Sequence, residues 1–158
     1  MLMSILLLSA LLPSHAVPQC RTAQLRLTAD DHGGGYNGMS HSGTELLIRN
    51  TGQACMLPAN PALDMRDARG RVVARGDASQ ATGTAVRLGT GGRGSIELRW
   101  VSNGVFEHNR NVHARFIVMR IGNGTLRAPI DATLYGEAGA GFGFEQTAAH
   151  HPEAAPHP

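Results

Sequence analysis

The sequence predicts an all-β protein, and its strand pattern is typical of an immunoglobulin-like antiparallel β-sandwich of about 7–9 short strands. Three observations lead to this prediction. Short stretches alternate apolar and polar residues, turn-forming clusters separate them, and no helical period follows residue 16. A true immunoglobulin domain has a tryptophan between its two cysteines, whereas Trp100 follows both cysteines here. We therefore expect the architecture without membership of the immunoglobulin family.

Four strands are predicted in the first half of the chain, each from an alternating stretch. A loop over residues 29–43 follows the first strand, because its run of glycines leaves the backbone too free for regular structure. Asn50-Thr51-Gly52 indicates a turn after the second strand, and Gly70 suits the positive φ of a hairpin turn between the third and fourth. The four strands cover residues 24–28, 44–49, 62–66 and 71–74.

Four more strands are predicted in the second half, and the clearest places Ile96, Leu98 and Trp100 on one face. The strand after it is apolar on both faces and is expected at the centre of a sheet, beyond a polar loop over residues 102–114. We expect the domain to span residues 17–145 and to be followed by a disordered tail rich in His, Pro and Ala over residues 146–158. The strands cover residues 86–88, 95–101, 115–121 and 130–135.

Residues 1–16 are predicted to be a signal peptide. The apolar run from Met3 to Leu12 is followed by Ser14-His15-Ala16, with small residues at the two positions that a signal peptidase inspects. The run is about half as long as a membrane-spanning helix. A lipoprotein would need a small residue before Cys20, where Gln19 stands. We therefore expect cleavage after Ala16, an exported protein in the periplasm or outside the cell, and no stable membrane insertion after cleavage.

The two cysteines of an exported chain permit one intramolecular bridge, between Cys20 and Cys55. This bridge would close a loop of about 36 residues, for which the chain-entropy estimate is roughly 4 kcal/mol of stabilisation. Redox-active pairs usually have the spacing C-x-x-C, which does not occur in the sequence. We therefore predict a structural disulfide.

The charge of the chain argues against a nucleic acid or an anionic membrane as partner, because the formal net charge is only +2. All fourteen basic residues are arginine. Together with the abundant Ala and Gly, this bias is typical of coding in a GC-rich bacterial genome. It indicates a solvated outer face.

No catalytic or cofactor site is predicted. Residues 89–94 match G-x-G-x-x-G, but a dinucleotide site needs a helix after the motif, and the alternation that follows residue 94 indicates a strand. Ser40 and His41 are sequence neighbours that we expect to point apart on an extended backbone, whereas a serine nucleophile needs its base across the fold. We therefore expect no enzyme activity, no catalytic residues and no cofactor.

Histidine and methionine provide the alternative hypothesis. Met39 and His41 form an M-x-H element of the kind used by periplasmic copper carriers, since thioether and imidazole are suitable copper ligands. His150, His151 and His157 lie in the expected tail. Loop histidines are commonly only solvated, so these five residues are weak candidates for a periplasmic copper- or zinc-binding protein.

The chain also resembles a known family. The shared residues are Cys20-Arg21-Thr22-Ala23, Leu25, Leu27, Asn50-Thr51-Gly52, Cys55, Leu57, Pro61, Asp67-x-x-Gly70, Leu88, Gly91-Gly92 and Leu98-Arg99-Trp100. Over about residues 20–101 the chain is thereby similar to the exported bacterial family known as domain of unknown function 4232. The resemblance implies an exported all-β domain with an N-terminal disulfide, and it implies no activity.

The resulting hypothesis is an exported, non-enzymatic β-sandwich module of the bacterial envelope with a binding or structural role. Its partner would be an envelope protein or a glycan that the sequence does not identify. Contact is expected at the edge strands and at the long loops over residues 29–43 and 102–114.

Overall fold

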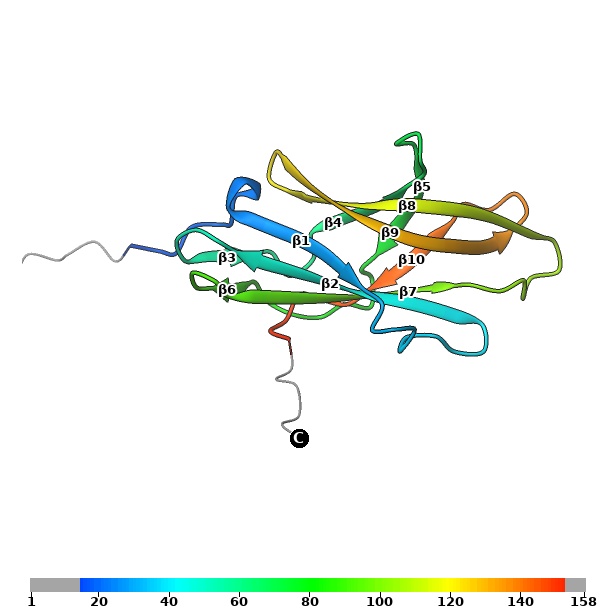
Figure 1. The fold of residues 1–158 in the computed structure, drawn as a ribbon, viewed down its shortest axis with the longest axis horizontal. Coiled ribbons are helices and arrows are strands. Elements are labelled where there is room, and N and C mark those ends of the chain that lie inside the picture. Colours follow the sequence, from blue (N-terminus) through cyan, green and yellow to red (C-terminus); the bar gives the residue numbers. More distant parts are fainter. Residues whose placement is uncertain (1–14, 153–158) are drawn as a thin grey trace, which may run out of the picture.

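The computed structural model describes residues 15–152. Residues 1–14 of the predicted signal peptide lie outside the described residues, and so do residues 153–158 of the expected tail, including His157. The described chain is all-β, as predicted, and contains no helix long and apolar enough to cross a membrane (Figure 1). A short 3-10 turn, η1 (Thr22–Gln24), precedes the strands β1 (Leu25–Asp30), β2 (His41–Asn50), β3 (Cys55–Leu57), β4 (Ala62–Arg66), β5 (Val72–Asp77), β6 (Val86–Leu88), β7 (Arg93–Val101), β8 (Asn109–Ile121), β9 (Gly124–Glu137) and β10 (Gly143–Gln146).

Eight strands form one large mixed sheet in the order β1-β2-β7-β10-β5-β4-β8-β9, and β3 pairs with β6 in a small second sheet. The described residues form ten strands rather than the expected 7–9. The expectation of an antiparallel fold is wrong at β10, which is antiparallel to β7 but parallel to β5. These pairings mean that β5 and β7 point in opposite directions. Any strand inserted between them must therefore run parallel to one of the two.

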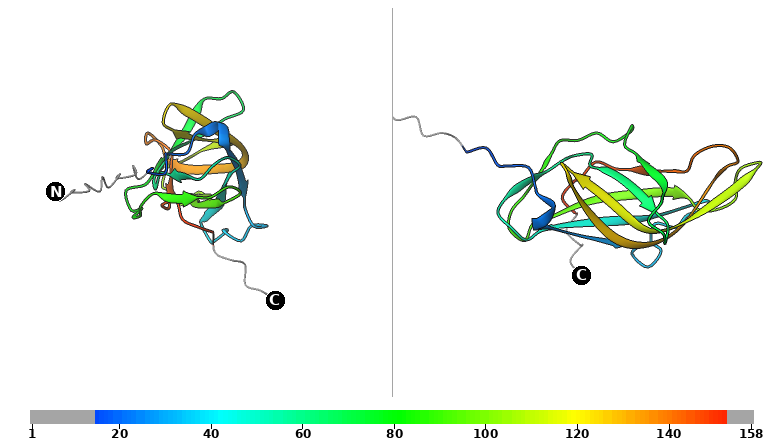
Figure 2. Two further views of the ribbon diagram at one scale, coloured as in Figure 1. Left: turned by 90° about the vertical axis from the view of Figure 1, so that its left-hand side faces the viewer. Right: turned by 90° about the horizontal axis from the view of Figure 1, so that it is seen from above.

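The large sheet curls so that β1 and β9, at its two ends, contact each other. The end-on view in Figure 2 shows the strands surrounding a central core. Because aromatics are scarce, that core is filled mainly by aliphatic residues and methionine, and each fully buried side chain of this kind contributes roughly 1.5–3 kcal/mol. The most buried members are Leu25, Leu46, Ile48, Leu57, Met65, Leu88, Ile96, Leu98, Ile117, Met119 and Leu134.

The alternation along β7 is confirmed, since Ile96, Leu98 and Trp100 are buried while Glu97 and Arg99 are exposed on the outer face. β8 lies between β4 and β9, which confirms its predicted interior position in the sheet. It is longer than predicted, because residues 109–113 of the expected loop pair with residues 133–137 of β9.

The predicted disulfide between Cys20 and Cys55 is present and buried. Cys55 begins β3. Backbone bonds run beside the bridge, from the N–H of Cys20 to the carbonyl of Met56 and from the N–H of Met56 to the carbonyl of Pro18. The segment before β1 is therefore held against the small sheet by covalent and hydrogen bonds together.

The expectation of disorder from residue 146 onward is wrong for residues 146–150. Gln146 ends β10 and donates its side-chain amide to the carbonyl of Pro61, and Ala148 and Ala149 are buried. His150 exchanges two backbone hydrogen bonds with Ser95 of β7, at 2.7 and 3.0 Å. This segment is ordered because neighbouring strands supply its hydrogen-bond partners. It was predicted to be disordered because it lacks an apolar period, and that criterion does not detect pairing with distant strands.

Candidate functional site: the loop between β1 and β2

The loop that connects β1 to β2 begins with a compact turn. The carboxylate of Asp30 accepts a bond from the N–H of His32, and that of Asp31 accepts one from the N–H of Gly33. His32, Gly33 and Gly34 all have positive φ, at 50°, 64° and 86°. Glycine adopts this region freely, whereas a residue with a Cβ is strained there by on the order of 1 kcal/mol. The glycine-rich segment therefore forms a defined turn and holds the imidazole of His32 in place.

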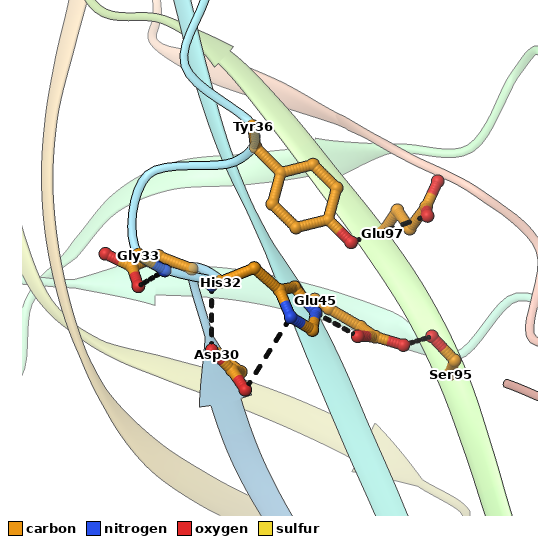
Figure 3. A network of polar contacts seen from close by, with 8 residues as sticks. Asp30, His32, Gly33, Tyr36, Glu45, Ser95 and Glu97 are labelled. Atoms are coloured by element: carbon orange, nitrogen blue, oxygen red, sulfur yellow. Dashed lines mark hydrogen bonds and ion pairs between the residues drawn. The ribbon is translucent and has the colours of Figure 1, made fainter. Parts of the chain in front are cut away.

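A chain of polar contacts fastens this turn to the outer face of β2 and β7 (Figure 3). Ser95 Oγ donates to Glu45 Oε1 at 2.5 Å, and the second carboxylate oxygen, Oε2, lies 2.5 Å from His32 Nε2. His32 Nδ1 lies 3.9 Å from the carboxylate of Asp30. Farther along the loop, the Tyr36 hydroxyl donates a long 3.5 Å bond to Glu97. The loop is thus folded back over the sheet by residues from three strands.

This arrangement places two carboxylates side by side, because Glu45 of β2 is the register partner of Glu97 of β7. Like charges at opposed positions repel each other, so each carboxylate benefits from a donor of its own. The hydrogen bond that His32 donates to Glu45 raises the pKa of His32 above its ordinary value. Burial alone would raise the pKa of Glu45, but the bonds from Ser95 and His32 outweigh it and lower that pKa. Burial, followed by the charge of Glu97, raises the pKa of Tyr36 to about 12, so its hydroxyl stays protonated and can donate.

The network contains serine, histidine and a carboxylate, but not in the order of a hydrolase. A serine nucleophile needs histidine between itself and the carboxylate, whereas Glu45 lies here between Ser95 and His32. Ser95 is also fully buried. The arrangement can hold the loop and cannot activate a nucleophile.

The sequence neighbours Ser40 and His41 do not point apart as expected. Ser40 Oγ lies 3.0 Å from His41 Nδ1, because the backbone turns where the loop enters β2. No carboxylate orients His41 among residues 15–152, as a catalytic base would require.

Two clefts flank the loop, and Asn37 lines both. The first, which we call the seam, has a volume of about 670 Å³ and lies where the two ends of the curled sheet meet. Asp30 and Asp31 line it on the β1 side, residues 130–133 on the β9 side, and Trp100 in between. No backbone ladder joins β1 to β9 in the described part of the chain, so the seam is bordered by two strand edges.

The second cleft, which we call the groove, has a volume of about 740 Å³ and lies over the outer face of β7 and β10. The loop forms one wall through residues 35–38, and residues 79–82 form the other. Glu97, Arg99 and Glu145 lie along its floor. The groove therefore bears more negative than positive charge.

The candidate metal ligands are not brought together. Met39 is 98% exposed at the tip of the loop. His41 pairs with Val101 at one end of β7, whereas His150 pairs with Ser95, six positions away, or about 20 Å along a strand. His151 is exposed. The described residues contain no group of three or more His, Cys, Asp or Glu that could hold a metal ion.

The residues that do converge on the loop, His32, Glu45 and Ser95, were missed by the sequence analysis. The predicted strands place Glu45 on an outer face, but the partner of that carboxylate depends on the register between β2 and β7. The neighbouring glycines explain the turn at His32, yet they do not indicate where its imidazole points.

Comparison with known proteins identifies a family and no individual relative. No curated protein and no solved structure matches the chain. A family model described as "Domain of unknown function (DUF4232)" matches residues 20–152. The match begins at the first cysteine of the disulfide, covers all ten strands and includes the ordered segment after β10. It extends the resemblance seen over residues 20–101, and the chain belongs to this family of domains of unknown function, DUF4232.

Proposed function

We propose that the protein is an exported, non-enzymatic binding domain of the bacterial envelope whose seam takes an extended segment of a partner protein. The observation that carries the proposal is the cavity bordered by the edges of β1 and β9, which share no backbone ladder in residues 15–152. An exposed strand edge presents unpaired N–H and C=O groups, and an extended peptide can satisfy them by adding a strand.

The lining of the seam suits such a segment. Trp100 and Ile130 supply apolar surface, while Asp30, Asp31 and Asp131 give the rim negative charge. The volume of about 670 Å³ falls within the range of roughly 300–1,000 Å³ that is usual for ligand sites. We therefore expect the partner segment to combine an apolar side chain with flanking basic residues.

Export is supported by the buried disulfide, since such bonds persist in oxidising compartments. A non-catalytic role is supported by the order of Ser95, Glu45 and His32, which does not suit nucleophilic attack. We interpret the curled sheet as an immunoglobulin-like sandwich in which the wall formed by β2, β7 and β10 packs against the wall formed by β4, β8 and β9. In folds of this kind the strand edges are available to partners.

The test is a selection from a random library of twelve-residue peptides displayed on phage, followed by titration of synthetic hits. Ser102→Arg places a large side chain in the seam, and Ser79→Arg places the same side chain in the groove as a matched control. We expect hits with basic and apolar residues whose binding is lost only in the Ser102 variant. Hits that bind both variants alike, or binding on a glycan array with no peptide hits, would contradict the proposal.

A further inference from the structure

The outer face of β5, β4, β8 and β9 carries four arginines, and we call it the arginine face. On β4, Leu63 and Met65 point into the core, so Asp64 and Arg66 point outward. The register sets Asp64 between Arg75 of β5 and Val118 of β8, and Val118 opposite Arg127 of β9. Arg120 follows two positions after Val118 on the same face. The four arginines are Arg66, Arg75, Arg120 and Arg127.

A buried carboxylate lies beneath two of these arginines. The side chain of Asp64 is 1% exposed, and its Oδ1 accepts a 2.7 Å bond from Arg66 Nε. Its Oδ2 lies 3.5 Å from a terminal nitrogen of Arg120 and has no hydrogen-bond partner in the described residues. The hydrogen bond that Arg66 donates to Asp64 raises the pKa of the Arg66 guanidinium. Asp64 therefore anchors Arg66 and attracts Arg120 while their outer nitrogens face solvent.

The other two arginines carry free positive charge. The guanidinium of Arg127 stacks over the ring of Phe116, with its carbon 3.4 Å from the ring centroid. Stacking fixes the plane of the group and leaves the N–H donors at its edge available. Neither Arg75 nor Arg127 lies within ion-pair distance of a carboxylate in residues 15–152. Four guanidinium groups thus face one buried carboxylate, which leaves a local excess of positive charge on a chain whose total is only +2.

The spacing of these charges follows the sheet. Adjacent strands lie about 4.8 Å apart, and each of the four strands contributes one arginine to the face. Arg75 and Arg127 lie in the register row of Asp64. Arg66 and Arg120 lie two positions from that row on opposite sides, and their guanidinium groups reach back to Asp64. Guanidinium groups bind carboxylates through two parallel hydrogen bonds, which a point charge cannot provide. An extended polymer with a carboxylate on each unit complements this arrangement.

We propose that the arginine face binds a linear glycan that carries carboxylate groups, crossing the four strands with its charges on Arg75, Arg66, Arg120 and Arg127. A single-stranded nucleic acid suits the face less well, because Phe116 is already covered by Arg127 and cannot stack with a base. A membrane surface also suits it less well, because Val72 is the one large apolar side chain exposed on these strands in the described residues, while Met39 and Val105 belong to loops elsewhere. The site is independent of the seam.

The test measures binding of the full chain to oligomers of galacturonic acid by titration calorimetry. The double variant Arg75→Gln/Arg127→Gln removes the two charges that do not contact Asp64, and Arg87→Gln/Arg93→Gln removes two exposed charges outside the face as a matched control. We expect the first variant to lose about tenfold or more in affinity and the control to stay within about twofold. Equal losses in the two variants, or no binding by the unaltered chain, would overturn the proposal.

A second variant distinguishes binding by arginines held in fixed positions from nonspecific attraction to positive charge. Asp64→Asn keeps the shape of the side chain, adds one unit of positive charge and weakens the anchor of Arg66. We expect weaker binding in this variant, with the emission of Trp100 unchanged as a check on folding. Tighter binding would contradict the anchoring role of Asp64. Equal affinity of the unaltered chain for phosphatidylglycerol vesicles or for a DNA oligonucleotide would contradict the glycan as the preferred occupant.

Discussion

The two outer walls of the curled sheet each hold a carboxylate that is largely shielded from water, and they use it differently. On the wall formed by β2 and β7, both oxygens of Glu45 accept close contacts, one from Ser95 and one from His32. On the wall formed by β4 and β8, one oxygen of Asp64 accepts a bond from Arg66 and the other has no hydrogen-bond partner among residues 15–152. The first carboxylate holds a loop in place, and the second orients exposed cations.

The difference shows how the cost of burying a charge depends on its partners. A buried carboxylate with several donors tolerates the loss of one, whereas a carboxylate with a single donor does not. The wall formed by β2 and β7, which we call the loop wall, should therefore respond mildly to single substitutions but should depend on pH through His32 and Glu45. The arginine face should respond sharply to loss of one arginine and little to pH.

Arg66→Ala is expected to have the largest effect on stability. It removes the only hydrogen-bond donor found for the Asp64 carboxylate among the described residues and leaves the buried charge with one cation, Arg120, at 3.5 Å. Breaking a buried pair in this way costs about 3–5 kcal/mol. Urea denaturation monitored by Trp100 fluorescence measures the change. Asp64→Asn/Arg66→Ala serves as the control, because it removes the buried charge and should recover much of the loss.

Ser95→Ala is expected to destabilise the protein by only about 1 kcal/mol, since Glu45 keeps its contact with His32. The same urea titration compares it directly with the Arg66 variant. A loss of stability as large as that of Arg66→Ala would contradict the expected difference between the two walls.

The loop wall is expected to depend on pH. The pKa of His32 is raised above 6.5 in the folded protein, so its contribution is complete below that value and is lost as pH rises through the raised pKa. The pKa of Glu45 is lowered below 4.5, so its contribution is present above that value and is lost as pH falls through the lowered pKa. The loop should be held best between about pH 4.5 and 6.5.

Amide hydrogen exchange of residues 31–40, corrected for the intrinsic effect of pH, measures this dependence. His32→Gln should remove the decline above pH 6.5. The strands of the arginine face provide an internal reference, because guanidinium groups stay charged throughout this range. A parallel change in protection on both walls would indicate a global effect rather than release of the loop.

Tyr36→Phe is expected to have the smallest effect. Its hydroxyl makes a single 3.5 Å bond to Glu97, at the outer limit for a hydrogen bond. Stability should change by less than about 0.5 kcal/mol. Hydrogen exchange should show slightly faster opening near residue 36, and a large change would mean that this contact matters more than its length indicates.

Much of the fold was predictable because local pattern and tertiary structure agree. Alternation located β4 and β6 at the residues predicted, and the pair Cys20–Cys55 followed from there being two cysteines. β10 was missed because residues 143–146 are few and their partners, β5 and β7, lie far away in the sequence. The contacts on the wall formed by β2 and β7 were missed for the same reason, since Glu45 and Ser95 are 50 positions apart and meet only through strand register.

The place of β10 has a consequence for how this chain reaches its final form. β10 is the last strand along the described residues, yet it occupies the middle of the large sheet, between β5 and β7. Until β10 pairs with them, β5 and β7 each present an edge of unpaired N–H and C=O groups, which promotes aggregation. In the export that we propose, a chain threaded from its N-terminus would keep most of its length unpaired until the sheet closes, and this would favour a holding chaperone during passage.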